Sequence, residues 1–593
     1  MLGIFKYFKR KDWALVVISF GFIISGVWFD LKLPEYLANI TTLVQTLGST
    51  MQDIWIAGAM MILCTLGSLV SAIIVGFLSA IIGASFSKNL RSVLFNKVES
   101  FSMEEINKFS TASLITRTTN DITQVQMLIV MGLQLIVKAP ITATWAIIKI
   151  TGKGYGWTLS TGIAVLIMVV VMSLMIILVM SKFKKMQRLT DNMNRVTREN
   201  LTGLRVVRAY NAEDHQEKKF ADANEELTET HLYVTRATAF LNPILMFIMS
   251  SLSLAIYFIG AHLINKADLT LNAAGVPEKL VIFSNMVVFS QYAGQIVGAF
   301  ILLTMIFMLY PRASVSARRI NEVLEADFTI IDGNRTEGLS GVKGEVSFTN
   351  VSFKYPGTVD YVLRDISFTV KQGETIAFIG STGSGKSTLV NLIPRFFDTT
   401  EGKIFVDGLN IREYTLESLR NKIGYVPQKS VLFTGTVSSN IGYGDNGSDC
   451  FSESDIKDAI RIAQATDFVE AMEGEYQAKI AQGGTNVSGG QKQRLSIARA
   501  VCRKPEFYIF DDSFSALDYK TDRALRTMLK EETAEVTTII VAQRIGTIID
   551  ADQIIVLDEG RVVGHGQHKE LLQKCEVYRE IARGQLSEEE LAS

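Results

Sequence analysis

Six long runs of apolar residues fill the first half of the chain and alternate with polar segments. A helix needs roughly 20 apolar residues to cross a bilayer, and each run reaches or exceeds that length once its flanks are included. We therefore expect six membrane-spanning helices, several of which continue beyond the bilayer as stalks. The runs are Trp13–Phe29, Ile54–Ser87, Ile122–Val137 with its continuation past Lys138 to Ile148, Gly154–Ser181, Ala237–Ala261 and Leu280–Pro311.

Basic residues are concentrated in alternate segments between these runs. The N-terminal segment and the long segments 88–121 and 182–236 are rich in Lys and Arg, whereas 30–53, 149–153 and 262–279 are shorter and poorer in them. The positive-inside rule then places both termini and the two long segments in the cytoplasm. Segment 182–236 has few Pro or Gly and is expected to be almost continuously helical. The first run lacks a small-residue cleavage site and is expected to be retained as a span.

The second half of the chain has the composition of a soluble domain, and it contains a glycine-rich phosphate-binding motif. The motif follows the apolar strand Thr375–Ile379 and precedes a helical run. Its glycines let backbone N–H groups approach phosphates, its lysine supplies positive charge to the β- and γ-phosphates, and its serine offers a hydroxyl to Mg²⁺. The candidate residues are Gly380, Ser381, Thr382, Gly383, Ser384, Gly385, Lys386, Ser387 and Thr388.

Two further motifs suit the same chemistry. Asp511 follows the apolar strand Phe507–Phe510, and a carboxylate at a strand end near a phosphate-binding loop suits the Mg²⁺ shell. Downstream of the loop, a Ser-Gly-Gly-Gln sequence opens the helical stretch Lys492–Arg503, which predicts an anion site at a helix N-terminus for a γ-phosphate. Its residues are Ser488, Gly489, Gly490 and Gln491.

In this order the motifs resemble those of the ATP-binding cassette (ABC) exporters, in particular their half-transporters. The resemblance covers nearly the whole chain. It implies a multidomain protein that binds ATP and Mg²⁺. An all-α six-helix transmembrane domain at 1–311 would be followed by a mostly helical linker at 312–342 and an α/β P-loop nucleotide-binding domain at 343–593.

The resemblance assigns roles to further residues. Tyr355 is similar to the aromatic residue that stacks on adenine, and Gln428 to the glutamine that senses Mg²⁺ and the membrane domain. A loop of four residues is similar to the one that contacts the opposite cassette. Two stretches occupy the places of the coupling helices, of which the second docks on the partner's cassette. These sets are Ser515, Ala516, Leu517 and Asp518 for the dimer loop, and Ile115, Thr116 and Arg117 with Ala209, Tyr210 and Asn211 for coupling.

Two catalytic positions depart from the family pattern. Asp512 stands where the family usually has the glutamate that acts as general base, and Gln543 stands where it usually has a histidine that contacts the γ-phosphate. Aspartate is one methylene shorter, and glutamine cannot become a cation. The chain thus resembles one subunit of the bacterial heterodimeric multidrug exporters. We expect its own ATP site to hydrolyse poorly, its Ser488–Gln491 motif to complete the partner's site, and the partner chain to carry Glu and His.

Composition adds limits to this interpretation. The net charge of −1 gives no electrostatic case for nucleic acid, and the mean hydropathy of +0.24 fits a membrane protein. The four cysteines lack metal-ligand spacing and are expected to be free thiols.

Four polar residues lie inside the expected spans. They suit either a substrate cavity or hydrogen bonding between helices, and the sequence leaves both open. They are Lys138, Ser284, Gln291 and Gln295.

The leading hypothesis is therefore a heterodimeric exporter of hydrophobic or amphipathic small molecules in the plasma membrane of a bacterium. A lipid or peptide exporter of the same architecture is an alternative. A regulatory ATP-binding subunit without transport is another, although six spans and the coupling stretches argue against it.

Overall fold

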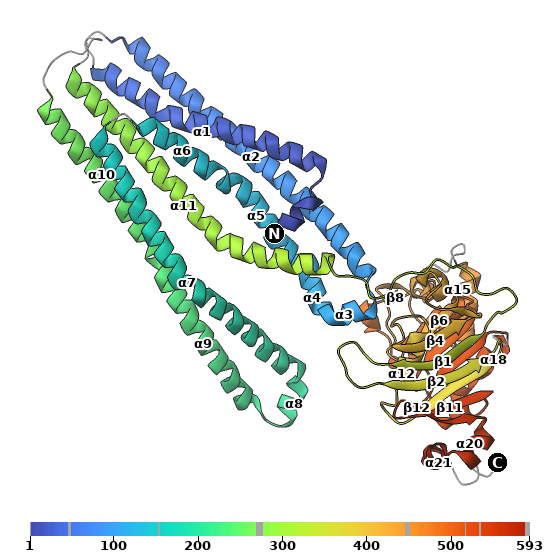
Figure 1. Ribbon diagram of the computed structural model, residues 1–593. Helices are drawn as coiled ribbons and strands as arrows, with labels where there is room; N and C mark the ends of the chain where they lie inside the picture. Colours follow the sequence, from blue (N-terminus) through green and yellow to red (C-terminus); the bar gives the residue numbers. More distant parts are fainter. Residues whose placement is uncertain are drawn as a thin grey trace. The chain divides into compact units, whose positions relative to one another are not determined.

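The computed structural model describes residues 2–45, 49–151, 154–267, 277–444, 451–515, 517–532 and 535–586. They form two compact units (Figure 1). The helical unit comprises Met1–Glu99 and Ala112–Ala326, and the α/β unit comprises Ser100–Thr111 and Asp327–Ser593. The α/β unit is thus built from two separate segments of the sequence.

The helical unit consists of long helices joined by short connections. Six of its stretches are long and apolar enough to cross a membrane, which confirms the six expected spans. A short π-helical turn (Arg117–Asp121) and a second (Gly132–Ile136) interrupt the third stretch. The helices are α1 (Arg10–Gln45), α2 (Met51–Glu99), α4 (Thr111–Thr116), α5 (Ile122–Met131), α6 (Lys138–Ile150), α7 (Tyr155–Thr202), α8 (Leu204–Ala209), α9 (Glu213–Ala239), α10 (Leu241–Lys266) and α11 (Glu278–Leu324).

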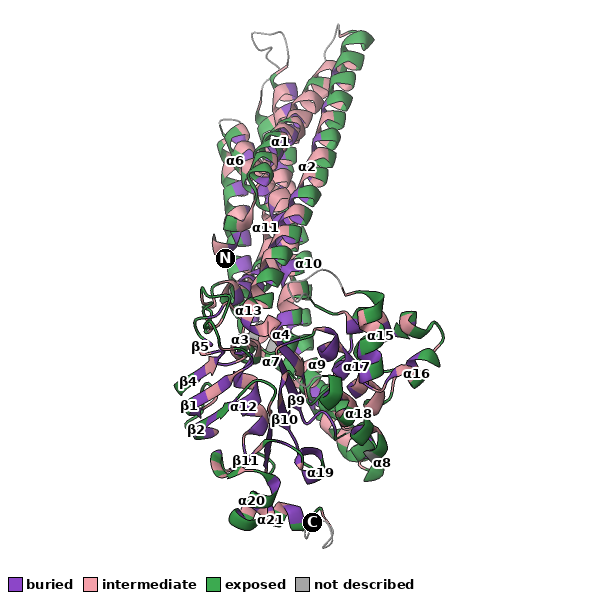
Figure 2. Cartoon of the chain, turned by 90° about the vertical axis from the view of Figure 1, so that its right-hand side faces the viewer, coloured by how far each residue is buried: buried purple, intermediate pink, exposed green. Residues whose placement is uncertain are grey.

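Large apolar side chains lie exposed along these helices, whereas the parallel strands at the centre of the α/β unit are mostly buried (Figure 2). Such a surface is not stable in water over this length, but it matches the hydrocarbon interior of a bilayer. On α2 the exposed residues include Ile62, Leu63, Leu66, Leu69, Val70, Ile73 and Phe77.

Of two expectations about helix continuity, one is confirmed. Segment 182–236 is almost continuously helical, with short breaks at Gly203, after α7, and at residues 210–212, after α8, where Asn211 adopts a left-handed φ of 51°. A residue in that conformation cannot continue a right-handed helix. The expectation of a mostly helical linker was wrong: α11 extends into it as far as Leu324, and residues 325–342 contain no further helix.

The α/β unit is organised around a six-stranded sheet in the order β12-β11-β3-β10-β9-β6, parallel except for β12. An antiparallel sheet in the order β2-β1-β4-β5 and a two-stranded β7-β8 sheet complete it. The strands are β1 (Val346–Phe353), β2 (Leu363–Val370), β3 (Thr375–Gly380), β4 (Glu401–Val406), β5 (Leu409–Asn410), β6 (Ile423–Val426), β7 (Gly435–Thr436), β8 (Lys479–Ile480), β9 (Phe507–Asp511), β10 (Thr537–Val541), β11 (Gln553–Asp558) and β12 (Arg561–Gly566).

Helices cover this framework and bury two apolar clusters, one of which contains Phe378, Phe507 and Ile539. Strands buried on both faces read as continuous apolar runs, and Phe507–Phe510 is such a run. The helices of the unit are α3 (Met103–Phe109), α12 (Lys386–Leu392), α13 (Leu416–Asn421), α14 (Val437–Ile441), α15 (Glu453–Ile462), α16 (Thr466–Glu470), α17 (Gly489–Cys502), α18 (Tyr519–Glu532), α19 (Ile545–Ile548), α20 (His568–Lys574) and α21 (Glu576–Arg583).

Three of the four cysteines, Cys64, Cys502 and Cys575, are buried free thiols, as expected. Cys450 lies outside the described residues.

Candidate functional site

The carboxyl ends of β3, β10 and β9 lie at one edge of the parallel sheet. Val541 of β10 pairs with Phe378 of β3 on one side and with Asp511 of β9 on the other. The loop after β3, the residue after β10 and the end of β9 therefore converge. Ligands of open α/β sheets bind at this edge.

The glycine-rich loop needs its glycines for two different reasons. Gly385 adopts a φ of 97°, which residues with a side chain avoid, and it immediately precedes α12. At Gly380 an added Cβ would lie 1.9 Å from the carbonyl oxygen of Leu557 on the neighbouring strand. The loop thus brings its backbone N–H groups to the start of α12, where they form a cradle for phosphate.

Lys386 lies inside this loop and is mostly buried. Its Nζ donates to the carbonyls of Gly380 at 2.9 Å and Ser381 at 2.7 Å, and to Ser384 Oγ at 3.2 Å. Burial lowers the pKa of Lys386, although the nearby Asp512 and Asp511 oppose this shift. A buried ammonium group that binds only neutral oxygens is suited to exchange them for phosphate oxygens.

Ser387 and Asp511 form a set of oxygen ligands that fits Mg²⁺. Ser387 Oγ donates to Asp511 Oδ1 at 2.7 Å, and Asp511 is buried. Burial and the neighbouring Asp512 raise the pKa of Asp511, while the Ser387 hydroxyl and the Lys386 ammonium oppose this shift. A hydroxyl and a carboxylate at this distance are typical of the protein share of a Mg²⁺ site, because the ion keeps waters and phosphate oxygens as its other ligands.

Asp512 is held from two sides by amide groups. Its Oδ2 accepts hydrogen bonds from Gln543 Nε2 at 2.7 Å and from Gln428 Nε2 at 3.3 Å. The residue has a left-handed φ of 49°, and its own N–H donates to the carbonyl of Val541. Burial raises the pKa of Asp512. The structure thus brings together the two candidate catalytic residues, Asp512 and Gln543, and the candidate Mg²⁺-sensing residue Gln428.

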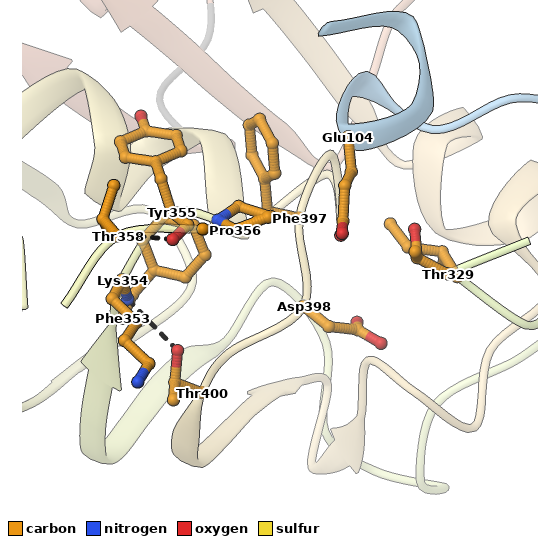
Figure 3. Close-up of a pocket in the computed structure, with 12 residues that line it drawn as sticks. Glu104, Thr329, Phe353, Lys354, Tyr355, Pro356, Thr358, Phe397, Asp398 and Thr400 are labelled. Carbon is orange, nitrogen blue, oxygen red and sulfur yellow. Dashed lines mark hydrogen bonds between the residues drawn. The ribbon is translucent and has the colours of Figure 1, made fainter. Parts of the chain in front are cut away.

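Tyr355 lies at a pocket of about 370 Å³ (Figure 3). Its ring meets those of Phe353 and Phe397 edge to face, and its hydroxyl lies 3.0 Å from Thr388 Oγ1. This bond ties the pocket to the first turn of α12, just beyond the phosphate loop. An aromatic lining with polar groups at its rim suits a flat base such as adenine.

The Ser-Gly-Gly-Gln motif opens α17 as an exposed helix start. Ser488 caps the helix: its Oγ accepts from the N–H of Gln491, whose Oε1 accepts in turn from the N–H of Ser488. Ser488 and Gly489 are exposed, and a Cβ at Gly489 would meet nothing within 4 Å. The motif can therefore receive an anion presented by another molecule.

The predicted dimer loop follows Asp512 directly. Ser515 Oγ donates to the carbonyl of Asp512 at 3.0 Å, Leu517 is buried, and Asp518 Oδ1 accepts from the N–H of Thr521 at the start of α18. Ala516 lies outside the described residues.

The two predicted coupling stretches both belong to the helical unit. Ile115 and Thr116 end α4, and Arg117 binds α11 through the Arg319 carbonyl and Glu322. In the second stretch, Ala209 ends α8, Tyr210 is 80% exposed, and Asn211 follows it in the left-handed conformation described above. An exposed tyrosine at a helix tip is available for contact with another domain or chain.

Sequence reasoning missed α3, which precedes the first of these stretches and belongs to the α/β unit. Glu105 of α3 is buried and accepts from the N–H and hydroxyl of Thr329, at 2.8 and 2.6 Å. Its neighbour Glu104 lines the pocket of Tyr355 (Figure 3). The available signal was the capping box Ser102-x-x-Glu105, which marks a helix start between two spans.

The polar residues of the spans mostly join helices to one another. Lys138 forms an ion pair with Asp30 at 3.1 Å. Ser284 and Gln295 each donate to a carbonyl of α1, whereas Gln291 is exposed. For Ser284 and Gln295 the structure favours helix-to-helix hydrogen bonding over a cavity lining.

Two family models match the chain: that of the ABC transporter transmembrane region at residues 16–300, and that of the ABC transporter at residues 363–515. A relative in Mycobacterium tuberculosis, described as an uncharacterized ABC transporter ATP-binding protein, is 38% identical over 99% of this chain and 98% of its own length. The chain belongs to the ABC transporter family. This ABC transporter is an exporter half-transporter in which a P-loop ATPase is coupled to transport.

The chain is also similar to a named lipid flippase and to an ABC exporter of known structure. An ATP-dependent lipid A-core flippase of Pseudomonas fluorescens is 32% identical over 83% of this chain and 79% of its own length. A solved bacterial Atm1-family ABC exporter with ATP bound matches with a TM-score of 0.81 and 25% identity, over 97% of this chain and 99% of that one. The six-helix membrane domain followed by an α/β nucleotide-binding domain is thereby confirmed.

Proposed function

We propose that this ABC transporter is the subunit of a heterodimeric exporter that retains ATP at its own site and hydrolyses it poorly. The partner is a second half-transporter with Glu and His where this chain has Asp512 and Gln543. The exported compounds are hydrophobic or amphipathic. Both termini and the ATP-binding domain lie on the cytoplasmic side of the plasma membrane, in line with the basic N-terminal segment.

The observation that carries this proposal is the hydrogen bond between Gln543 and Asp512. A general base must present its carboxylate to a water molecule, but Oδ2 of Asp512 is already engaged by two amides. Gln543 uses one of the two N–H groups of its amide on Asp512, and this bond fixes the direction of the other. The two residues that depart from the family pattern are therefore hydrogen-bonded to each other. This pairing favours a site that binds nucleotide without rapid turnover.

Lipid export is the second candidate, and two flippase relatives favour it. Proteins named ATP-dependent lipid A-core flippase in Pseudomonas fluorescens and Syntrophus aciditrophicus are 32% and 31% identical to this chain. A lipid is itself an amphipathic compound, so this candidate narrows the cargo and leaves the ATP chemistry unchanged.

The test compares the chain purified alone with the chain purified together with the product of a neighbouring half-transporter gene. We expect brisk ATP hydrolysis only in the second preparation. Rapid hydrolysis by this chain as a homodimer, unchanged by Asp512→Ala, would exclude a degenerate site. Copurification of the two chains in a fixed one-to-one ratio provides an independent measure of heterodimer formation.

A further inference from the structure

A proline in α1 creates a polar centre among the helices of the helical unit. Pro34 has no N–H, so the carbonyl of Asp30 four residues earlier lacks its helical donor. Gln295 of α11 donates to this carbonyl at 3.2 Å, and the buried Tyr292 donates its hydroxyl to the next carbonyl, that of Leu31, at 2.9 Å. Side chains of α11 therefore donate hydrogen bonds to the backbone carbonyls of α1 next to the proline.

Charged side chains surround this break. Asp30 pairs with Lys138 of α6 at 3.1 Å and also accepts a hydrogen bond from Ser68 of α2. Glu35 pairs with Lys32 and with Lys149 of α6, each at 2.6 Å. We call this connected set the α1 hub; it comprises Asp30, Lys32, Glu35, Ser68, Lys138, Lys149, Tyr292 and Gln295.

The α1 hub contains one more positive than negative charge. Three lysines face two carboxylates, and Glu35 is shared by two of the lysines. The charged side chains are 27 to 38% exposed, so a ligand can reach them. Gln295 Oε1 is a buried oxygen without a hydrogen-bond partner among the described residues. The set therefore has an unbalanced positive charge, which favours an anion, whereas the unused oxygen of Gln295 can accept a hydrogen bond only from a protonated oxygen of such a group.

The residues of the α1 hub lie near the end of the spans that is distant from the N-terminus of α1. At 1.5 Å per residue, Asp30 and Glu35 lie about 30 and about 38 Å beyond Arg10, where α1 begins. Lys149 is in the last turn of α6. Because the hydrocarbon core is about 30 Å thick, the hub reaches from its outer edge to the headgroup region. At this level, partly buried lysines in excess of their carboxylates attract the anionic groups of molecules whose headgroups lie at the same depth.

We propose that the α1 hub binds the anionic headgroup of an amphipathic molecule, a phosphate or a carboxylate, while the apolar tail remains among the apolar side chains of the spans. This inference rests on the proposed export of amphipathic compounds and narrows them to anionic ones. A bilayer lipid and an exported compound share this headgroup chemistry.

Two substitutions change the charge of the hub in opposite directions. Lys149→Gln leaves Glu35 with Lys32 and Asp30 with Lys138, which makes the hub neutral. Glu35→Gln removes a carboxylate and raises the excess charge to two. We expect the first to weaken and the second to strengthen binding of lysophosphatidic acid to the transporter in phosphatidylcholine nanodiscs, each by about tenfold. Lysophosphatidylcholine of the same chain length should respond to neither.

These opposite signs separate a binding site from a structural role. If the hub only holds the helices together, both substitutions will weaken binding or leave it unchanged, and either result overturns the proposal. Lys266→Gln, at the exposed end of α10, is the matched control that removes a lysine outside the hub. A tenfold weakening by Lys266→Gln would also overturn the proposal, because the effect would then not be specific to the hub.

Two further measurements identify the occupant and separate this inference from the proposed function. We call the opposite responses of binding to Lys149→Gln and Glu35→Gln charge-tuned binding. If phosphatidylglycerol in the nanodisc competes with lysophosphatidic acid, the proposal is supported and the occupant is a bilayer lipid. If binding is charge-tuned but phosphatidylglycerol does not compete, the proposal is supported and the occupant is an exported compound. Binding is measured without ATP, whereas ATP-driven movement of a fluorescent anionic amphiphile is measured in proteoliposomes. Charge-tuned binding without movement would support the hub and contradict export. Movement without charge-tuned binding would support export and overturn the hub.

Discussion

Gln543 donates its amide to Asp512 at 2.7 Å, so the two residues that depart from the family pattern bind each other directly. A glutamate and a histidine at these positions would form a different pair, with a longer carboxylate and a ring able to carry charge. Here the side chain of Gln543 cannot carry a positive charge, and the side chain of Asp512 is one methylene shorter than that of glutamate. The proposal that this site holds nucleotide without rapid turnover rests on this pair.

Restoring the family residues should restore turnover at this chain's site. We expect Asp512→Glu combined with Gln543→His to raise nucleotide turnover there by about tenfold or more, because a positioned general base contributes at least that much. The measurement is release of labelled phosphate from nucleotide bound to this chain in the assembled transporter.

The single substitutions serve as controls for that pair. Gln543→His alone leaves the short carboxylate in place and should give little gain. If the double substitution also leaves turnover unchanged, something other than these two residues limits the site.

Substitutions on the two sides of the ATP-binding domain should act on different sites of a dimer. Lys386→Ala should abolish labelling of this chain by azido-ATP, because the phosphates lose their buried cation. Gly489→Asp should spare that labelling and suppress turnover at the partner's site, because it adds a negative charge to an anion site that has room for a side chain. Equal loss at both sites from either change would contradict this division of roles.

The placement of the candidate nucleotide-binding residues at one sheet edge and at helix starts could be predicted from the sequence because their patterns are local. The glycine-rich loop, Asp511 and the Ser488–Gln491 motif each carry a spacing that works only before a helix or at a strand end. The partners of Lys138 and Asp512 could not be predicted in this way. Asp30 and Gln543 are distant in sequence from the residues they bind, and only the packing of helices or the order of strands brings them together.

Helix α3 shows the same limit in another form. Its seven residues lie between two spans and look like part of a cytoplasmic loop, yet they belong to the α/β unit. Membership of a compact unit depends on tertiary contacts, which local patterns do not encode.

Removing the carboxylate of Glu105 should weaken the attachment of α3 to the α/β unit. Glu105→Ala leaves the N–H and hydroxyl of Thr329 without their charged acceptor, which should cost about 2 to 3 kcal/mol. Protease sensitivity of the segment between Ser100 and Thr111 in the intact transporter measures this loss. Glu104→Ala, on the same helix but only half-buried, is the matched control and should leave the segment protected.

Stability of the α/β unit should decrease as the pH falls through the titration of His568. This histidine is buried and its Nδ1 lies 2.7 Å from the hydroxyl of Tyr578. Burial and the nearby Lys569 lower its pKa, while Asp550 opposes the shift. Because the folded pKa lies below the unfolded value of 6.5, the stabilisation is present above pH 6.5 and is lost as the pH drops below it.

The measurement is the thermal unfolding temperature of the α/β unit in the intact transporter between about pH 5 and 8. His568→Phe should flatten the decline, whereas the exposed His565→Gln should preserve it. A decline of the same slope in His568→Phe would show that another group is responsible.

The two-segment composition of the α/β unit limits how this protein can be divided or recombined. A fragment that begins at the end of α11 would lack α3, leave Thr329 without its acceptor and remove Phe101 from the ring of Phe328, which is already partly exposed. Exchange of ATP-binding domains between relatives at a single junction would likewise combine one protein's α3 with another protein's docking surface. Successful chimaeras should therefore need three junctions, one on each side of α3 and one after α11, with the first two inside what hydropathy alone marks as the membrane domain.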